Sequence, residues 1–165
     1  MSLAEAAAEA DALAEQGDER ALSTLRAKWE EEVEHAARSQ DFRERAVAYR
    51  AIAQFRFKQK TELLRRGLED ESPACRGSAV LSLERLSRDS PGVVNGARAL
   101  LNEMAARDGN EAVRRLAIVS LKNGSADRGT IQLLEGMAGD DEQAKELRDA
   151  ASKVAAALKK KSRER

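Results

Sequence analysis

The sequence predicts an all-α fold built from repeated helix pairs, and three observations support this. Alanine, leucine, glutamate and arginine dominate the 165 residues, and all four are strong helix formers, whereas proline occurs only twice. No stretch rich in Val, Ile and Thr alternates with polar residues, so the sequence offers no candidate strand. Helix start and stop signals recur with only a few residues between them, which predicts that successive helices are antiparallel neighbours.

The N-terminal part of the chain is predicted to form three helices. Gly17-Asp18 ends the first helix and caps the second, because glycine favours a C-terminal turn and aspartate accepts N-terminal N–H groups. Asp41, followed by Glu44, gives the third helix a capping-box pattern, and a weaker break follows at residues 60–61. The second helix carries a one-sided apolar stripe. Its members are Leu22, Leu25, Trp29, Val33 and Ala36.

The remaining helices are separated by clear boundary signals. Ser72-Pro73 supplies an N-cap followed by proline at the first helical position, where the missing N–H costs nothing. Asparagine, glycine and acidic pairs mark the later breaks, and the acidic pair is expected to cap the ninth helix. These boundaries are Ser90-Pro91, Gly109-Asn110, Asn123-Gly124 and Asp140-Asp141.

The second helices of four predicted pairs share one pattern: an arginine, an alanine three residues later, and an apolar or small residue four after that. The four sets are Arg45-Ala48-Ile52, Arg76-Ala79-Leu83, Arg114-Ala117-Leu121 and Arg148-Ala151-Ala155. Roughly a dozen residues before each arginine, the first helix of the pair carries an apolar residue. These are Val33, Leu64, Leu101 and Leu134. A helix-pair repeat with a period of about 30 to 40 residues is typical of a solenoid, in which neighbouring pairs share one core.

The segments LEDESPACRGSAVLSLERL and RDGNEAVRRLAIVSL resemble HEAT repeats, with an acidic turn followed by arginine, alanine and leucine. The resemblance covers about residues 19–158. It implies a right-handed α–α superhelix of about four antiparallel helix pairs plus an extra N-terminal helix. It also implies a ladder in which a turn acid meets a helix arginine of an adjacent repeat. The structural repeat positions are Arg45, Asp70, Arg76, Asp108, Arg114 and Arg148, the last of which is two residues out of register with its acids.

We expect a single domain over residues 1–165. Residues 1–17 form the extra N-terminal helix, and residues 161–165 form a basic tail. The helix-pair repeats are predicted at 18–60, 61–89, 90–124 and 125–160.

Composition limits the classes of protein to consider. Charged residues make up 35% of the chain, and 29 basic residues cancel 29 acidic ones. A single cysteine excludes an internal disulfide framework. The opening residues have neither the basic start nor the apolar stretch of a signal peptide, and no apolar run approaches the ~18 residues that span a bilayer. We therefore expect a cytoplasmic protein with no membrane partner.

Catalysis is not predicted. Cys75 beside Arg76 could be an activated thiol, but the only histidine, His35, lies in a different repeat, and a nucleophile needs a base within reach. Cys75 is interpreted as a small repeat residue equivalent to Val113. One histidine cannot build a metal centre, and no phosphate-binding loop is present, so we expect no catalytic residue, cofactor or metal. An enzyme of the HEAT-like lyase type, or an enzyme accessory subunit, is the second alternative.

The favoured hypothesis is a non-catalytic scaffold or adaptor that presents a concave groove to another protein or peptide. Residues two and five positions after each repeat arginine should face outward, yet several of them are apolar and have charged neighbours, as a peptide or helix partner would require. The predicted groove residues are Val47, Arg50, Leu81, Arg85, Arg115, Leu116 and Val119. If the assigned face is wrong by one position, the apolar members belong to the core instead.

A nucleic-acid-associated HEAT-like protein is the first alternative. Residues 43–66 contain eight basic residues and two acids, and the tail is also basic. Against this, the chain as a whole is neutral and only 3% aromatic, whereas nucleic-acid-binding domains usually carry a basic excess and stacking residues.

Overall fold

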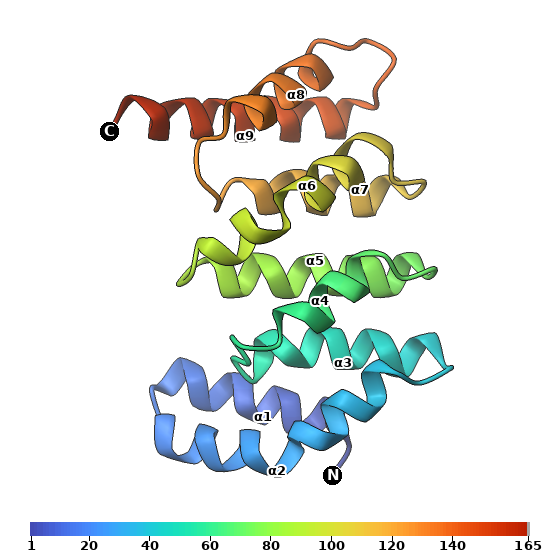
Figure 1. Cartoon of the computed structure of the whole chain (residues 1–165), viewed down its shortest axis with the longest axis vertical. Helices are drawn as coiled ribbons and strands as arrows, with labels where there is room; N and C mark the ends of the chain where they lie inside the picture. The colour runs from blue at the N-terminus through green and yellow to red at the C-terminus, as the bar shows by residue number, and fades with distance from the viewer. Residues whose placement is uncertain (165) are drawn as a thin grey trace. The chain divides into compact units, whose positions relative to one another are not determined.

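A computed structural model of the chain describes residues 1–164 as nine α-helices joined by short turns (Figure 1). The helices are α1 (Leu3–Gln16), α2 (Glu19–Ala37), α3 (Phe42–Gln54), α4 (Thr61–Leu68), α5 (Pro73–Ser87), α6 (Gly92–Arg107), α7 (Glu111–Leu121), α8 (Arg128–Ala138) and α9 (Lys145–Arg163). No strand occurs in these 164 residues, which confirms the predicted all-α class.

The helices fall into two compact units, Met1–Leu86 and Ser87–Arg165, called unit 1 and unit 2 below. Unit 1 holds α1 to α4 and all but the last residue of α5, and unit 2 holds α6 to α9. The single domain over residues 1–165 and the right-handed sense of its superhelix stay predictions.

Unit 1 places α1 against both α2 and α3, and α3 also packs on α2 and α4. Leu3, at the start of α1, lines a shallow hollow with Arg43 at the start of α3. Asp11, further along α1, contacts Arg56 just beyond the end of α3. The two helices are therefore parallel neighbours, and Figure 1 shows them in one layer with α2 and α4 in the other. The extra N-terminal helix thus occupies the place of a second helix in a pair that has no first helix.

Unit 2 contains two helix pairs, α6 with α7 and α8 with α9. The first helices of the pairs, α6 and α8, also pack on each other, as do the second helices α7 and α9. This arrangement is the stacking that a helix-pair repeat requires, because each pair then shares its core with the next.

The buried residues confirm the register predicted for the repeats. The four alanines of the repeat pattern have no exposed surface, and the apolar residue predicted in each first helix is equally buried. The residues are Ala48, Ala79, Ala117 and Ala151 in the second helices, and Val33, Leu64, Leu101 and Leu134 in the first. A small residue at this position lets neighbouring helices approach closely.

Gly67 in α4 marks a still closer approach of helices. A methyl group built on this residue would lie 2.9 Å from the Cβ atom of Ala79 in α5 and 3.1 Å from the ring of Tyr49 in α3. Only glycine fits there without movement of the neighbours, because real Cβ atoms do not come so near another carbon.

The aromatic residues of the chain all lie in unit 1. The rings of Phe55 and Phe57 are buried with their centroids 5.4 Å apart, a typical distance for an aromatic pair. Tyr49 is also buried, Trp29 is half-buried in α2, and Phe42 is exposed at the start of α3. The core of unit 2 consists of aliphatic residues and methionines instead.

Several predicted helix boundaries are confirmed. Gly17 adopts the left-handed conformation, with φ of 75°, and ends α1. The side chain of Asp18 then accepts the N–H of Ala21 at 3.1 Å and caps α2. Asp41 caps α3 by accepting the N–H of Arg43 at 2.9 Å.

Other boundary predictions were wrong. The Asp140-Asp141 pair does not cap α9, which begins at Lys145 after an N-cap residue, Ala144, that makes no side-chain bond. Asp140 instead accepts the N–H of Glu142 at 3.0 Å and stabilises the preceding turn.

Three further boundaries differ from the sequence prediction. Helix α9 continues through Arg163, so much of the predicted tail is helical, and Arg165 lies outside the described residues. Helix α6 begins at Gly92, one residue later than expected. A full capping box at Ser2 and Glu5, which the sequence prediction did not include, starts α1.

Candidate functional site

The four apolar residues of the predicted groove are exposed or half-buried. Leu81 in α5 has 40% of its surface exposed, and Val47 in α3 is half-buried. In unit 2, Leu116 and Val119 of α7 are also half-buried, beside an exposed Arg115. Leu81 therefore lies outside the core, while Val47, Leu116 and Val119 lie between the core and the surface.

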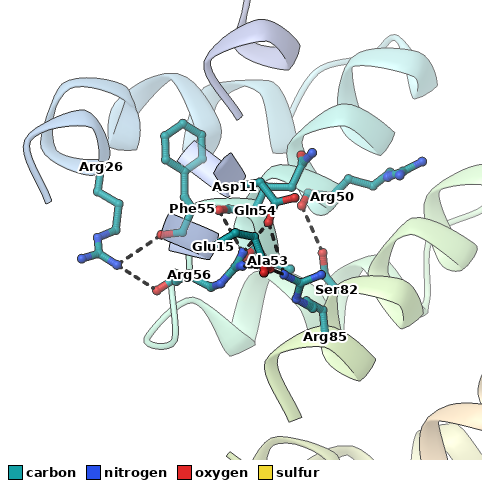
Figure 2. Close-up of polar contacts among 10 residues, drawn as sticks. All are labelled: Asp11, Glu15, Arg26, Arg50, Ala53, Gln54, Phe55, Arg56, Ser82 and Arg85. Atoms are coloured by element: carbon teal, nitrogen blue, oxygen red, sulfur yellow. Dashed lines mark hydrogen bonds and ion pairs between the residues drawn. The ribbon is translucent and has the colours of Figure 1, made fainter. Parts of the chain in front are cut away.

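In unit 1, Arg50 and Leu81 are brought together by a contact between α3 and α5. The hydroxyl group of Ser82 donates to the backbone oxygen of Tyr49 and lies 3.4 Å from that of Arg50. Leu81, which precedes Ser82, therefore lies beside the α3 turn that carries Arg50. The Arg50 side chain is exposed and extends away from the polar contacts around it in Figure 2. Its guanidinium forms no hydrogen bond or ion pair with any described residue, so it is available to an acidic group.

Arg85 is occupied differently from the other predicted groove residues. Its guanidinium forms an ion pair with Glu15 and lies 3.5 Å from a carboxylate oxygen of Asp11, both of which belong to α1. Arg56 joins the same group, with its Nη1 2.8 Å from Asp11 and its Nη2 3.2 Å from Glu15 (Figure 2). We call Asp11, Glu15, Arg56 and Arg85 the α1 ion cluster. It attaches α1 to the end of α3 and to α5.

Arg56 is positioned by an unusual end to α3. It has φ of 60°, a left-handed conformation that glycine usually supplies at this place. The N–H groups of Arg56 and Phe57 donate to the carbonyls of Ala53 and Ile52, the two bonds of a Schellman motif. The guanidinium then folds back and donates to the carbonyls of Ala53 at 2.8 Å and Gln54 at 3.1 Å. The Arg56 guanidinium therefore neutralises the partial negative charge at the C-terminal end of α3 while it binds the acids of α1.

Helix α2 also contributes to the end of α3. The Nη1 atom of Arg26 donates to the carbonyls of Phe55 at 3.2 Å and Arg56 at 3.4 Å (Figure 2). The turn after α3 is thus held from two sides, which fixes the direction of the Arg56 side chain.

The predicted acid–arginine ladder has one complete rung in unit 1. Arg45 binds Asp70 through two bonds, Nε to Oδ2 at 2.8 Å and Nη2 to Oδ1 at 3.0 Å. Burial raises the pKa of Asp70, but the hydrogen bonds from Arg45 and from the Ser72 N–H, together with the Arg45 charge, outweigh it and hold the pKa below its usual value. The same guanidinium donates to two carbonyls of the preceding turn, so the rung connects adjacent helix pairs.

The remaining ladder residues have varied roles. Arg76 donates to the carbonyls of Asp70 and Glu71 at 2.9 and 3.2 Å. Asp108 accepts the N–H of Asn110 at 2.9 Å, as Asp70 does from Ser72.

In unit 2 the partner of Arg114 is an amide, because its Nη2 donates to the side-chain oxygen of Gln143 at 3.0 Å. Arg148, the residue out of register, has only a 3.3 Å contact with the fully exposed Asp141, and its buried Nε has no partner among the described residues.

Cys75 lies in the core, at the repeat position that the sequence equates with Val113. Cys75 has no exposed surface, and Val113 at the equivalent place in α7 is also buried. Its thiol donates to the carbonyl of Phe42 at 3.2 Å, and burial raises its pKa. A buried thiol with a raised pKa has little thiolate character.

His35 lies exposed on α2, near the shallow hollow between the starts of α1 and α3. No group of three or more His, Cys, Asp or Glu side chains that could hold a metal ion occurs in residues 1–164.

Half of the basic residues in the run at residues 43–66 are paired with acids within unit 1. Four of its eight basic residues make ion pairs with acids of unit 1: Arg45, Arg56, Lys60 and Arg65. Lys60 is nearly buried, and its Nζ lies 2.6 Å from Glu34 and 3.0 Å from Glu30. Burial lowers the pKa of Lys60, but these two carboxylates outweigh it and raise the pKa overall. The run is therefore not a continuous positive surface.

Comparison with known families agrees with this geometry. Residues 30–122, more than half of the chain, match HEAT repeats. The chain belongs to the HEAT-repeat family. The matched residues include the ladder pair Arg45 and Asp70 and the outer positions of α3, α5 and α7. Comparison with curated proteins gave no match. None of the helices described here combines the length and the apolar character needed to cross a membrane.

Proposed function

We propose that this HEAT-repeat protein is a non-catalytic scaffold or adaptor that binds a protein segment on the outer face of α3 and α5. The observation that carries the proposal is the pair formed by Leu81 and Arg50. Leu81 is an exposed large apolar residue in the middle of α5, and Arg50 beside it has no acidic partner in the described chain. HEAT repeats as a class present such helical faces to other proteins.

The side chains on this surface indicate what kind of partner it suits. Leu81 offers apolar contact area, and Arg50 offers a planar guanidinium suited to a carboxylate, whereas the half-buried Val47 lines the hollow beside the start of α1. We infer that the partner is a peptide or helix with an aliphatic or aromatic side chain close to an Asp or Glu. In unit 2, Leu116, Val119 and Arg115 repeat the same combination on α7.

The test compares variants of the full chain as bait in affinity capture from native lysate, followed by measurement of binding constants with the captured protein. Leu81→Glu and Arg50→Glu are each expected to weaken binding by tenfold or more, equivalent to about 1.4 kcal/mol. The reason is that the first buries a charge against the partner's apolar residue and the second repels its carboxylate.

Lys28→Glu and Ala27→Glu are matched controls, because both residues are exposed on α2, in the other layer of unit 1. They introduce the same charge and should leave the binding constant unchanged. Equal binding by Leu81→Glu, Arg50→Glu and the controls, with circular dichroism showing that all are folded, would reject this surface.

Binding of nucleic acid is the alternative outcome. Because phosphate contacts release counterions, affinity for a labelled duplex or single strand would fall steeply between about 50 and 200 mM salt. The ion pairs that four basic residues of 43–66 make with acids of unit 1 favour the protein partner.

A further inference from the structure

Helix α1 is attached to unit 1 by weaker apolar contacts than any other second-layer helix of this unit. Its fully buried residues are three alanines, Ala6, Ala7 and Ala10. By contrast, α3 buries Tyr49 and Ile52. Leu3 and Leu13 of α1 are only half-buried. The hydrophobic contribution grows with the apolar area removed from water, so a contact whose fully buried residues are all alanines contributes less than one that buries larger side chains.

The α1 ion cluster supplies the specificity that the alanines lack. Asp11 and Glu15 are one helical turn apart, so both carboxylates point the same way and meet Arg56 and Arg85 together (Figure 2). The Asp11 side chain is 37% exposed and the Glu15 side chain 63% exposed. Water and salt therefore reach the cluster, so its ion pairs weaken as the ionic strength rises.

The connection between α1 and α2 can be straightened. Only two residues reverse the chain direction there: Gly17 in its left-handed conformation and Asp18, which caps α2. The flanking residues, Gln16 and Glu19 among them, are good helix formers. If Gly17 and Asp18 both took helical angles, α1 and α2 would become one helix, and α1 would extend about 20 Å beyond the start of α2.

We propose that the site formed by α2, α3 and Arg85 accepts the α1 helix of a second copy of this chain. Two copies then exchange their α1 helices reciprocally and form a symmetric dimer. The occupant fits because it is the same helix, with the same alanines and the same pair of acids, that fills the site within one chain. Arg85 lies one helical turn after Leu81 on α5, so the exchange site adjoins the proposed partner surface, but neither Leu81 nor Arg50 belongs to it.

The experiment exploits the pairing of Glu15 with Arg85. Variant A is the full chain with Glu15→Lys, and variant B is the full chain with Arg85→Glu. In each variant alone, the α1 helix and its site carry like charges at this position. When the two are mixed, the helix of A suits the site of B, and the helix of B suits the site of A. We expect the mixture to form an A–B heterodimer, detected by native mass spectrometry, at least tenfold more abundant than either homodimer.

The cis double variant, Glu15→Lys with Arg85→Glu in one chain, is the matched control. It restores the ion pair within the chain and should dimerise no more than the wild type. Heterodimer formation that disappears at about 1 M salt, where charges are screened within about 3 Å, supports the exchange. A mixture that contains only the species seen for A and B separately would overturn it.

A second variant tests the hinge independently of charge. Gly17→Ala disfavours the left-handed turn and favours a continuous helix. Light scattering after size exclusion should show a tenfold larger dimer-to-monomer equilibrium constant than the wild type. The added methyl group meets no atom within 4 Å, so crowding does not complicate the result. An unchanged equilibrium constant would mean that α1 does not leave its own site.

Discussion

Replacing Asp70 with alanine is expected to lower the free energy of unfolding of unit 1 by about 3–5 kcal/mol, the usual result of breaking a buried pair on one side. Only 7% of the Asp70 side chain and 13% of the Arg45 side chain are exposed. The substitution leaves the Arg45 charge buried without its carboxylate. It also removes the acceptor for the Ser72 N–H at the turn before α5.

Urea denaturation followed by circular dichroism measures this loss. Asp141→Ala is the control, because the Asp141 side chain is 99% exposed and its 3.3 Å contact with Arg148 is a surface pair. Its removal should cost no more than about 1 kcal/mol. A similar, small loss for both substitutions would show that the Arg45–Asp70 rung does not stabilise the protein.

The same rung predicts how stability depends on pH. The pKa of Asp70 is lower in the folded chain than in the unfolded chain, so the unfolded state binds a proton first as the pH falls. The contribution of the rung is complete above the unfolded pKa of about 3.9 and is lost as the pH falls through the lower folded value. The Asp70→Asn variant should therefore lose less stability than the wild type between about pH 5 and pH 2.

Gly67→Ala is expected to destabilise unit 1, because overpacking costs about 1–3 kcal/mol. The higher helix propensity of alanine offsets only about 0.5–1 kcal/mol of this cost. The new methyl group would meet the Cβ atom of Ala79 at 2.9 Å and the Tyr49 ring at 3.1 Å. The Tyr49 ring and the α5 backbone are both held in the core, so they cannot move aside freely. The net effect should be a loss of stability, measured by thermal and urea denaturation.

Gly136→Ala in α8 is the matched control for this substitution. No atom lies within 4 Å of the added methyl group, so only the helix propensity changes. It should stabilise unit 2 by about 0.5–1 kcal/mol. If both substitutions stabilised the protein, α4 would not approach its neighbours as closely as the geometry at Gly67 requires.

The register of the repeats could be predicted from sequence because several copies reinforce one another. One alanine in a helix says nothing about burial, but Ala79 and Ala117 occupy the same place after Arg76 and Arg114. Aligning the repeats shows which positions keep the same kind of residue, because they pack in the same way, and which positions vary. It also removed Cys75 from consideration as a reactive thiol, since its equivalent is Val113.

The α1 ion cluster could not be predicted in this way. Arg85 and Glu15 are 70 residues apart in the chain, and no other repeat has an equivalent pair. The sequence assigned Arg85 to a partner groove, as it did Arg50, because both lie on the outer side of a second helix. Which arginine is already bound depends on where α1 packs, and an alanine-rich helix carries little sequence information about its neighbours.

The sequence also did not predict the left-handed backbone of Arg56 or the partner of Arg114. Arg56 takes a left-handed conformation that the sequence would assign to glycine, and its folded-back guanidinium satisfies the exposed carbonyls. Gln143 replaces the expected acid as the partner of Arg114, while Asp140 holds a turn.

Because every aromatic residue lies in unit 1, the two units differ in their spectroscopic signals. Trp29 is the only tryptophan and lies in α2, so fluorescence emission and near-ultraviolet absorption report on unit 1 alone. Far-ultraviolet ellipticity reports on the helices of both units. A denaturation curve recorded by both signals therefore shows, without any label, whether the two halves of the chain melt together or in sequence.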